Sequence, residues 1–204
     1  MRRVVVLFVA LMCGVSAMAQ GDARWWITRL DATLGERYTM HIAVAMGSEE
    51  PLQGLFMVDG DDYYIRLGVM EVYGDGELRY EINNERKEVT IDRVDLESVD
   101  LLTNPTRAFS FVDEEFATEL ISSDNEGATL RLTPRDESLG IDSIELRLSR
   151  NKDSVLPSVV AYNYGGDGVS IALDALPWSV EALPQWDKQA YRAYDIVSFL
   201  YIDY

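Results

Sequence analysis

The sequence is poor in the residues that most enzymes and metal sites require. Its 204 residues include one cysteine, Cys13, and one histidine, His41. Without a second histidine or a retained cysteine, the usual Cys-His and zinc sites cannot form, and a Ser-His-Asp triad would depend on His41 alone. A lone histidine within a predicted strand is more often structural than catalytic. We therefore expect a protein that is not an enzyme and uses no metal or cofactor.

Positive charge is also scarce, with 18 lysines and arginines against 35 aspartates and glutamates, a formal net charge of −17. Loss of Arg2 and Arg3 with a signal peptide would leave 16 basic residues against 35 acidic ones, a charge of about −19. Such a surface repels nucleic acid and anionic head groups and keeps an exported protein soluble. It would also limit loose adhesion to membranes while a pocket binds selectively.

Long apolar runs are absent after the N-terminus, where residues 4–15 follow Arg2 and Arg3. This run is too short to span a bilayer, and Ala17 and Ala19 fit the small-residue positions of a secretory cleavage site. We predict a signal peptide over residues 1–19, with Gln20 first in a periplasmic, cysteine-free chain that forms no disulfide. Lipidation at Cys13 is disfavoured because Met12 precedes it where a small residue is needed. Residues 20–204, about 185 in number, suit a single domain.

Period-two alternation of apolar and polar residues dominates the rest of the chain. It is clearest over residues 52–94, where Asp, Gly and Asn turns separate runs of five to eight residues. This pattern predicts an antiparallel meander with a continuous apolar face that must be covered. The predicted strands are residues 37–46, 52–58, 63–67, 69–73, 78–82, 88–94, 117–122, 129–133, 144–148, 158–162 and 169–173.

Helical spacing is clear only over residues 22–34, with Asp22 as N-cap and Gly35 as stop. Residues 96–104 are weakly helical, and residues 106–116 favour a short helix or a covering loop. The tail from Ala182 is rich in aromatic residues, which predicts a packed strand or loop. The fold class is thus mainly β, with ten or eleven strands and few helices.

Two turn-rich segments resemble ligand sites only superficially. Residues 59–62 (DGDD) fail the EF-hand pattern because Met70 stands at the twelfth position, so a hairpin turn is favoured over calcium binding. Residues 165–168 (GGDG) lack the following Gly-Lys-Ser/Thr of a phosphate-binding loop. Acidic residues are abundant enough for a catalytic carboxylate pair, but no pair stands out.

The methionines that remain after signal removal cluster in one third of the chain. Met40, Met46, Met57 and Met70 all fall on predicted strands, near Phe56. Methionine is flexible and suits surfaces that must fit varied apolar partners, although it also fills ordinary cores. The cluster favours an adaptable apolar cavity but leaves ordinary core filling open.

An ordered set of short motifs resembles one known family. GLFMV at residues 54–58 resembles a glycine-led, aromatic-rich strand, and Asp75-Gly76 followed by Tyr80 resembles a family hairpin. Pro105 falls where a proline-led helical insertion occurs, and residues 129–134 (TLRLTP) match a strand end. Over residues 22–200 the chain resembles the LolA-type periplasmic carriers of outer-membrane lipoproteins, in particular the divergent Bacteroidetes versions, with YDIV at residues 194–197 as a late segment.

The resemblance implies a strongly curved antiparallel half-barrel with helices over its open face and an apolar concavity for acyl chains. The implied cargo is an acylated lipoprotein or lipid, and the implied partners of the monomer are an inner-membrane lipoprotein exporter and an outer-membrane acceptor. The candidate cavity residues are Met40, Ile42, Val44, Met46, Phe56, Met57, Val58, Met70, Val72 and Tyr80. The candidate covering residues are Trp26, Leu30, Phe109 and Phe111.

One departure from the family affects the expected lid. Relatives place an arginine after the glycine-led strand to hold the lid closed, whereas this chain has Gly60 there, with Arg66 as a substitute. The leading hypothesis is a periplasmic carrier of acylated lipoproteins. The alternative is an envelope sensor or interaction domain on the same fold without transfer, and the third class is an enzyme on a β scaffold.

Overall fold

A computed structural model describes residues 22–47, 49–107, 109–178 and 182–200. The predicted signal peptide lies outside the described residues. The chain forms one twelve-stranded sheet in the order β12-β6-β5-β4-β3-β2-β1-β11-β10-β9-β8-β7. The strands are β1 (Arg37–Met46), β2 (Leu52–Asp59), β3 (Asp62–Leu67), β4 (Met70–Asp75), β5 (Leu78–Asn83), β6 (Glu88–Arg93), β7 (Phe116–Ser123), β8 (Gly127–Pro134), β9 (Ser143–Asn151), β10 (Ser154–Tyr164), β11 (Asp167–Leu176) and β12 (Asp195–Ser198).

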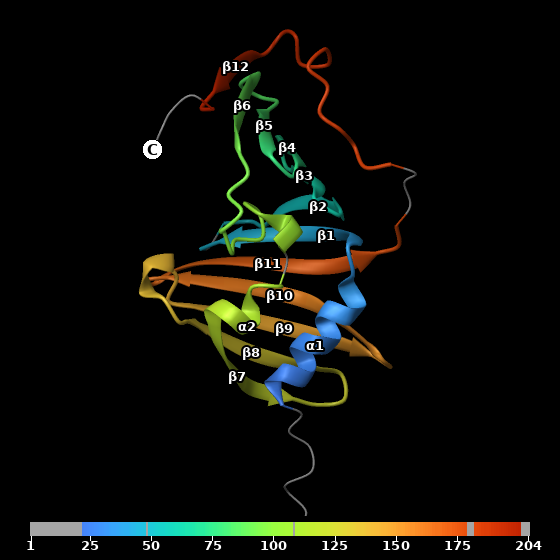
Figure 1. The fold of residues 1–204 in the computed structure, drawn as a ribbon, viewed down its shortest axis with the longest axis vertical. Coiled ribbons are helices and arrows are strands. Elements are labelled where there is room, and N and C mark those ends of the chain that lie inside the picture. Colours follow the sequence, from blue (N-terminus) through green and yellow to red (C-terminus); the bar gives the residue numbers. More distant parts are fainter. Residues whose placement is uncertain (1–21, 48, 108, 179–181, 201–204) are drawn as a thin grey trace, which may run out of the picture.

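The sheet is antiparallel throughout except at one edge, where β12 pairs in parallel with β6. It curves strongly but does not close, so β7 and β12 are its two edges. Figure 1 shows β7–β11 and β1 nearly face-on, while β2–β6 curl away toward the other end of the molecule. The predicted mainly-β, strongly curved half-barrel is therefore confirmed.

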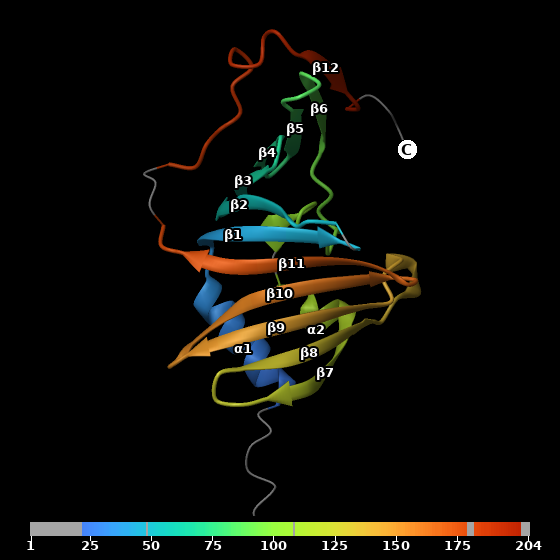
Figure 2. The ribbon, with the colours of Figure 1, turned by 180° about the vertical axis from the view of Figure 1, so that it is seen from behind.

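Helix α1 (Ala23–Leu34) lies across one face of the sheet and packs against β10 and β7. The carboxylate of Asp22 accepts a hydrogen bond from the backbone N–H of Arg24 at 3.2 Å, and the helix ends at Gly35, whose φ is +64°. Both predicted caps are confirmed. The buried stripe of the helix includes Trp26 and Leu30. Seen from behind, α1 and α2 (Val112–Glu115) lie beyond the sheet, so both occupy the same face (Figure 2).

The main core lies between this face and the elements that cover it. Successive residues of β1 alternate, so that Met40, Ile42 and Val44 point into the core and are 3% exposed or less. Near β4 the ring of Tyr63 packs directly on the backbone of Gly74, its cross-strand partner. A Cβ at position 74 would lie 2.0 Å from that ring. Any larger residue at position 74 would displace that buried ring.

A second core occupies the opposite face of the sheet, over β2–β6. The C-terminal segment covers it and places the ring of Trp186 between Tyr80 and Tyr191, at centroid distances of 4.8 and 5.0 Å. The predicted packed tail is thus confirmed for Leu183, Trp186, Tyr191 and Tyr194, whereas Ile196 and Val197 of β12 are 39% and 49% exposed. Its last strand, β12, brings the total to twelve. The buried and packed members are Leu55, Met57, Tyr64, Tyr73, Tyr80, Ile82, Val89, Ile91, Trp178, Leu183, Trp186, Tyr191 and Tyr194.

Strands β2–β4 are apolar on both faces, but from β5 onward the face toward the main core becomes polar. In β5, Tyr80 and Ile82 belong to the second core. Alternation therefore places Arg79 and Glu81 on the face of the main core, where they pair across the strands with Asp92 and Thr90. The main core is consequently apolar over β7–β11 and β1–β4 and becomes polar at β5 and β6.

The carboxylate of Glu71 joins the second core to the C-terminal segment. Its Oε2 accepts hydrogen bonds from the hydroxyls of Tyr73 at 2.9 Å and of Tyr64 and Tyr191 at 3.2 Å, while Asn84 donates to Oε1 at 2.7 Å. Burial raises the pKa of Glu71, but these four donors outweigh it and hold the pKa below its ordinary value. The ionised carboxylate is therefore the form that the fold favours.

Replacing Glu71 with glutamine should lower the free energy of unfolding by about 1–2 kcal/mol at pH 7, because several hydroxyl donors lose an ionised acceptor. Since the folded pKa is lowered, the stabilisation is complete above the pKa of the unfolded chain and is lost as the pH falls through the folded pKa. Urea titrations should show the difference between the two proteins shrinking below about pH 4. A difference that stays constant from pH 7 to pH 3 would contradict this role.

The segment after β6 differs from its prediction. Residues 95–104 form turns, not the weakly predicted helix. Asp95 and Asp100 each accept backbone N–H groups two and three residues ahead. Aspartate turns of this kind compete with helix formation, which explains the difference. The predicted short helix or covering loop that follows is confirmed as a 3-10 turn, η1 (Pro105–Arg107), and α2.

Candidate functional site

A segment without strands covers part of the main core beside α1. We call residues 95–107 and 109–115 the covering segment. It buries Val99, Leu101, Phe109, Phe111 and Val112 in the main core, each 9% exposed or less. None of its residues belongs to a strand, and a backbone hydrogen bond to the sheet region is found at its end, where the Glu115 carbonyl accepts the N–H of Arg135 at 2.8 Å. A cover of this kind can separate from the sheet without breaking a β ladder.

Two buried tyrosines of the sheet hold the backbone of the covering segment. The Tyr38 hydroxyl donates to the carbonyl of Pro105 at 2.9 Å. The Tyr162 hydroxyl donates to the carbonyl of Val99 at 3.1 Å and accepts the N–H of Leu101 at 2.9 Å. Burial raises the pKa of both hydroxyls, which therefore stay protonated and able to donate. These bonds satisfy backbone groups that have no strand partner.

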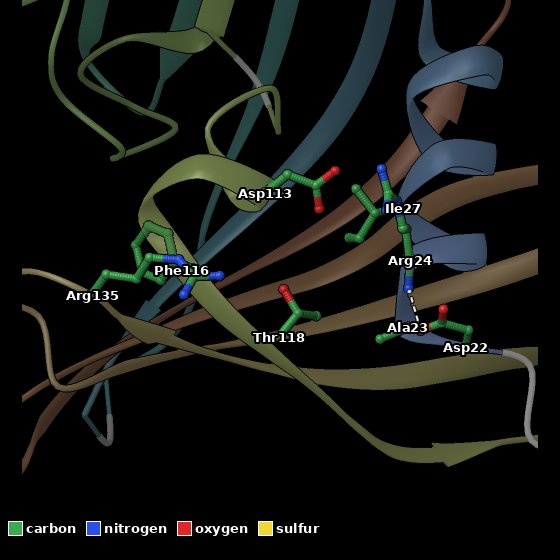
Figure 3. A pocket seen from close by; sticks show the side chains of 8 residues that line it. All are labelled: Asp22, Ala23, Arg24, Ile27, Asp113, Phe116, Thr118 and Arg135. Carbon is green, nitrogen blue, oxygen red and sulfur yellow. Dashed lines mark hydrogen bonds between the residues drawn. The ribbon is translucent and has the colours of Figure 1, made fainter.

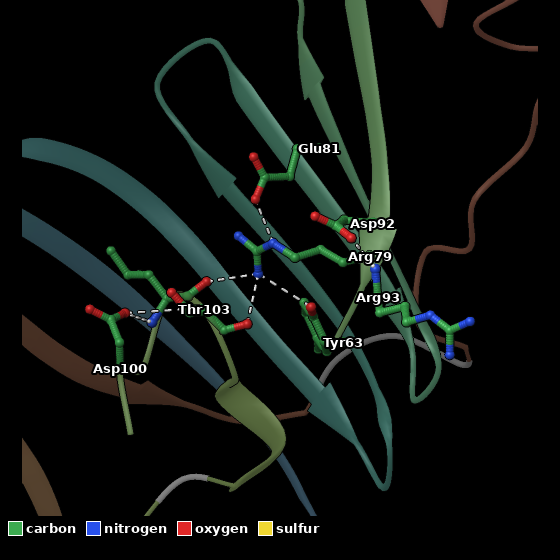
Figure 4. Close-up of polar contacts among 8 residues, drawn as sticks. Tyr63, Arg79, Glu81, Asp92, Arg93, Asp100 and Thr103 are labelled. Carbon is green, nitrogen blue, oxygen red and sulfur yellow. Dashed lines mark hydrogen bonds and ion pairs between the residues drawn. The ribbon is translucent and has the colours of Figure 1, made fainter. Parts of the chain in front are cut away.

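Arg79 holds the same segment from β5 (Figure 4). Its Nη1 donates to the carbonyls of Leu102 at 3.0 Å and Thr103 at 2.9 Å, and to the Tyr63 hydroxyl at 3.2 Å. Its Nε pairs with Glu81 at 2.5 Å. The Arg79 side chain is only 14% exposed, so these contacts are shielded from water. One guanidinium therefore connects the covering segment to the polar end of the main core.

A cleft lies between α1 and the covering segment (Figure 3). It consists of two open cavities, of about 350 and 220 Å³, and both are lined by Ile27 of α1 and Asp113 of α2. In Figure 3 the carboxylate of Asp113 points toward α1. The other lining residues of the larger cavity are Asp22, Ala23, Arg24, Phe116, Thr118 and Arg135. Those of the smaller cavity are Thr28, Asp31, Phe109 and Ser110.

The chemistry of the cleft is amphipathic. Ile27, Phe109 and Phe116 are buried apolar residues that also belong to the main core. Arg24 and Arg135 are exposed at the larger cavity together with the carboxylates of Asp22 and Asp113, so both signs of charge line its opening. A molecule with an apolar chain and a polar head would find matching surface here, with the core below and the charges at the opening.

The predicted cavity residues divide between the two faces. Met40, Ile42, Val44, Phe56, Val58 and Val72 lie in the main core, beneath α1 and the covering segment. Met57 and Tyr80 lie in the second core on the opposite face. Met46 is 49% exposed near the end of β1, and Met70 is half-buried at the start of β4. Contact of any of them with an acyl chain stays a prediction.

The predicted covering residues are all buried against the main core. Trp26 and Leu30 reach it from α1, and Phe109 and Phe111 reach it from the covering segment. Ile27, Asp113 and Arg79 were missed by sequence reasoning. Ile27 carried a usable signal, since it lies on the apolar stripe of α1, whereas the partners of Arg79 become visible only when residues 102 and 103 are placed beside β5.

The predicted substitute for the lid arginine is not at the covering segment. Gly60 occupies the β2–β3 turn with φ +64°. Arg66 instead lines a separate cavity of about 280 Å³ together with His41 and Gln53. His41 itself is exposed on β1, and the described residues contain no cluster suited to hold a metal ion. Arg79 of β5, and not Arg66, is the sheet arginine that donates to the backbone of the covering segment.

Comparison with solved structures agrees with this architecture. A conserved protein from Thermus thermophilus superimposes with a TM-score of 0.53 at 9% identity, covering 86% of this chain and 98% of that one. The LolA superfamily protein NE2245 from Nitrosomonas europaea matches with a TM-score of 0.38 at 9% identity, covering 84% and 98%. MucB in the Pseudomonas aeruginosa MucA/MucB complex matches with a TM-score of 0.39 at 17% identity, covering 79% and 59%.

These likenesses concern the fold. The Thermus thermophilus match, with its TM-score above 0.5, supports the open, curved and mainly β sheet that the sequence resemblance implied. No protein-family model and no curated protein matches the sequence. In the described part of the chain, no helix is long and apolar enough to cross a membrane.

Proposed function

We propose that this protein is a periplasmic carrier that binds the acyl chains of lipoproteins between its sheet and its cover and releases them to an acceptor. It acts by binding and not by catalysis. Its partners are an inner-membrane exporter that supplies the cargo and an outer-membrane acceptor that takes it. The cargo is an acylated protein or a lipid.

One observation supports this proposal most strongly. The apolar face of an open, curved sheet is covered by α1 and the covering segment, and a cleft with an apolar floor separates the two. Each methylene group removed from water contributes about 0.8 kcal/mol. Burial of part of an acyl chain would therefore offset the free-energy cost of separating the cover from the sheet. The polar ties to Tyr38, Tyr162 and Arg79 would oppose that separation and keep the empty protein closed.

Binding would therefore shift an equilibrium between closed and open forms. The closed form buries Phe109 and Phe111 in the main core. In the open form an acyl chain would take their place against Ile42, Val44 and neighbouring side chains. The ligand can favour the open form only by its extra contacts there, so affinity should rise with chain length until the core surface is filled.

An envelope sensor or interaction domain is the second candidate, because the same cover could open for a protein segment or signal lipid without transfer. Transfer to an acceptor separates the two. Native mass spectrometry of the protein purified from its own periplasm should show close to one acylated molecule per chain, displaceable by detergent. Bound cargo that is never passed to acceptor vesicles or receptor would favour the sensor.

Val44→Glu should weaken binding of a fluorescent fatty-acyl probe at least ten-fold, because Val44 is 3% exposed in the main core beneath the cover. Asp75→Asn is the control, since this exposed residue lies outside the main core and its carboxylate accepts the N–H groups of Glu77 and Leu78 in a turn. Probe titrations should be normalised to the folded fraction from circular dichroism. If Val44→Glu fails to fold, the nearly isosteric Val44→Thr replaces it, and we expect this variant to lose less affinity for the probe. Equal affinities for Val44→Thr, Asp75→Asn and the parent would contradict binding at this face.

A further inference from the structure

An exposed tryptophan on the outer side of α1 lies between two arginines. Trp25 is 37% exposed, although its neighbour Trp26 is buried and packs edge-on against it at 4.9 Å. The guanidinium carbon of Arg29 lies 5.6 Å from the Trp25 ring centroid, and that of Arg150, at the end of β9, lies 5.3 Å from it. Two separate elements thus bring a positive charge to one exposed indole.

The charge around Trp25 differs from that of the whole chain. Arg24, Arg29, Arg150 and Lys152 are exposed, and none of the four forms a salt bridge within the described residues. The nearby acidic residues are Asp22, which caps α1, Asp124 and Glu126 in the β7–β8 turn, and Asp153 in the β9–β10 turn. Positive and negative charges are therefore balanced here, whereas the chain as a whole carries −17.

A tryptophan flanked by arginines is suited to the interface between a membrane and water. The indole ring is stable at the depth of the head groups, and guanidinium groups form strong, often bidentate contacts with phosphate. The single ring exposes too little apolar area for a stable protein interface, which needs about 800 Å² per partner. It is sufficient for reversible adsorption that combines one shallow apolar contact with charge attraction.

We propose that the face formed by Trp25, Arg29 and Arg150 docks the protein on an anionic phospholipid surface. The net negative charge does not prevent this, because at physiological salt charges farther away than about 8 Å are largely screened. Arg24 connects this face to the cleft, since it directly precedes Trp25 on α1 and lines the larger cavity. Docking would bring the cleft close to the lipid head groups. The use of this position for loading or releasing cargo rests on the proposed function.

Vesicle flotation tests the docking face directly. A chain beginning at residue 20 is mixed at 150 mM salt with phosphatidylcholine vesicles, with or without 30% phosphatidylglycerol. We expect binding to the anionic vesicles only, and loss of that binding at 500 mM salt. Each arginine near an anionic surface changes the partition coefficient about five-fold, so Arg29→Gln with Arg150→Gln should weaken binding about thirty-fold. Trp25→Ala should also weaken it.

The control variants make the same kinds of substitution, two arginines to glutamine and one exposed apolar residue to alanine, at positions far from Trp25 in the sequence. Arg86→Gln with Arg93→Gln removes two exposed arginines at β6, and Val69→Ala shortens an apolar residue that is 49% exposed at the β3–β4 turn. Both should bind as the parent does. Docking at this face is overturned if the parent does not bind anionic vesicles at 150 mM salt, or if the control pair loses as much binding as the pair at Trp25.

Acyl-probe binding in solution without vesicles separates this inference from the proposed function. The docking variants should bind the probe with the parent's affinity, because Trp25, Arg29 and Arg150 do not line the cleft. Normal probe binding together with absent vesicle binding would overturn docking alone. Specific vesicle binding without any probe uptake would support docking and count against the carrier.

Discussion

Arg79→Met should free the covering segment while the sheet stays folded. The guanidinium donates to the carbonyls of Leu102 and Thr103 and is 14% exposed, so its loss leaves two backbone acceptors without their donor. Hydrogen bonds from a charged donor contribute about 1.5–3 kcal/mol each, and several are lost together. We expect the free energy of unfolding to fall by about 2–4 kcal/mol in a urea titration.

The location of the change distinguishes a lid contact from ordinary support of the sheet. Hydrogen exchange should accelerate in residues 95–107 more than in β5 itself, because local opening requires only the cover to detach. Uptake of a fatty-acyl probe should also become faster, since the closed form is less favoured. Arg79→Lys should be intermediate, because a lysine ammonium cannot reproduce the planar fork that reaches both carbonyls.

Arg93→Met is the matched control for Arg79→Met. Arg93 ends β6 beside Arg79 in the sheet, but its side chain is exposed. It should leave both the exchange of residues 95–107 and the rate of probe uptake unchanged. If Arg79→Met lowers the global stability while the covering segment exchanges at the parent's rate, the arginine supports the sheet and not the cover.

Much of the fold was predictable from local patterns. The alternation in β1, from Arg37 to Met46, and the aspartate and glycine turns between the next strands determine where the chain extends and reverses. Asp22 and Gly35 mark the ends of α1 because one caps backbone N–H groups and the other tolerates a positive φ. These features depend on neighbours in sequence, which a sequence displays directly.

The faces of the strands were not predictable, because alternation gives a period and no direction. Phe56, Met57 and Val58 are all buried, yet Met57 belongs to the core on the opposite side. Both faces of β2–β4 are covered, one by the covering segment and the other by Trp186 and Tyr191. Only the position of the C-terminal segment, more than 100 residues away, explains why Tyr80 faces outward from the main core.

The candidate site depends on tertiary contacts that local patterns cannot reveal. Tyr162 meets Val99 and Leu101 across more than 60 residues, and Arg79 meets Thr103 across 24. Each is an ordinary strand residue in the sequence. The resemblance to LolA-type carriers implied a lid arginine just after the glycine-led strand, β2, with Arg66 as its substitute. In the structure, an arginine of β5 donates to the backbone of the covering segment instead.

Tethering α1 to the covering segment should abolish ligand uptake. Thr28 and Ser110 line the same cavity of about 220 Å³ from opposite sides of the cleft. A chain beginning at residue 20 contains no cysteine, so Thr28→Cys and Ser110→Cys would supply its only thiols. Joining them with a short, reducible bis-thiol linker prevents the separation that an acyl chain needs to reach the main core. We expect the rate of probe uptake to fall at least ten-fold and to recover on reduction.

Two controls define what the tether changes. The double variant with each thiol capped separately carries the same substitutions without the link, and it should take up the probe at the parent's rate. A tether between Asn151→Cys and Ser154→Cys joins cross-strand partners of the β9–β10 hairpin, whose spacing the sheet already fixes, and it should have no effect. Uptake that continues at full rate through a tethered cleft would mean that acyl chains enter elsewhere. Separation of α1 from the covering segment would then not be the step that admits the acyl chain. The hydrogen bonds of Arg79, Tyr38 and Tyr162 to the covering segment would contribute to stability alone.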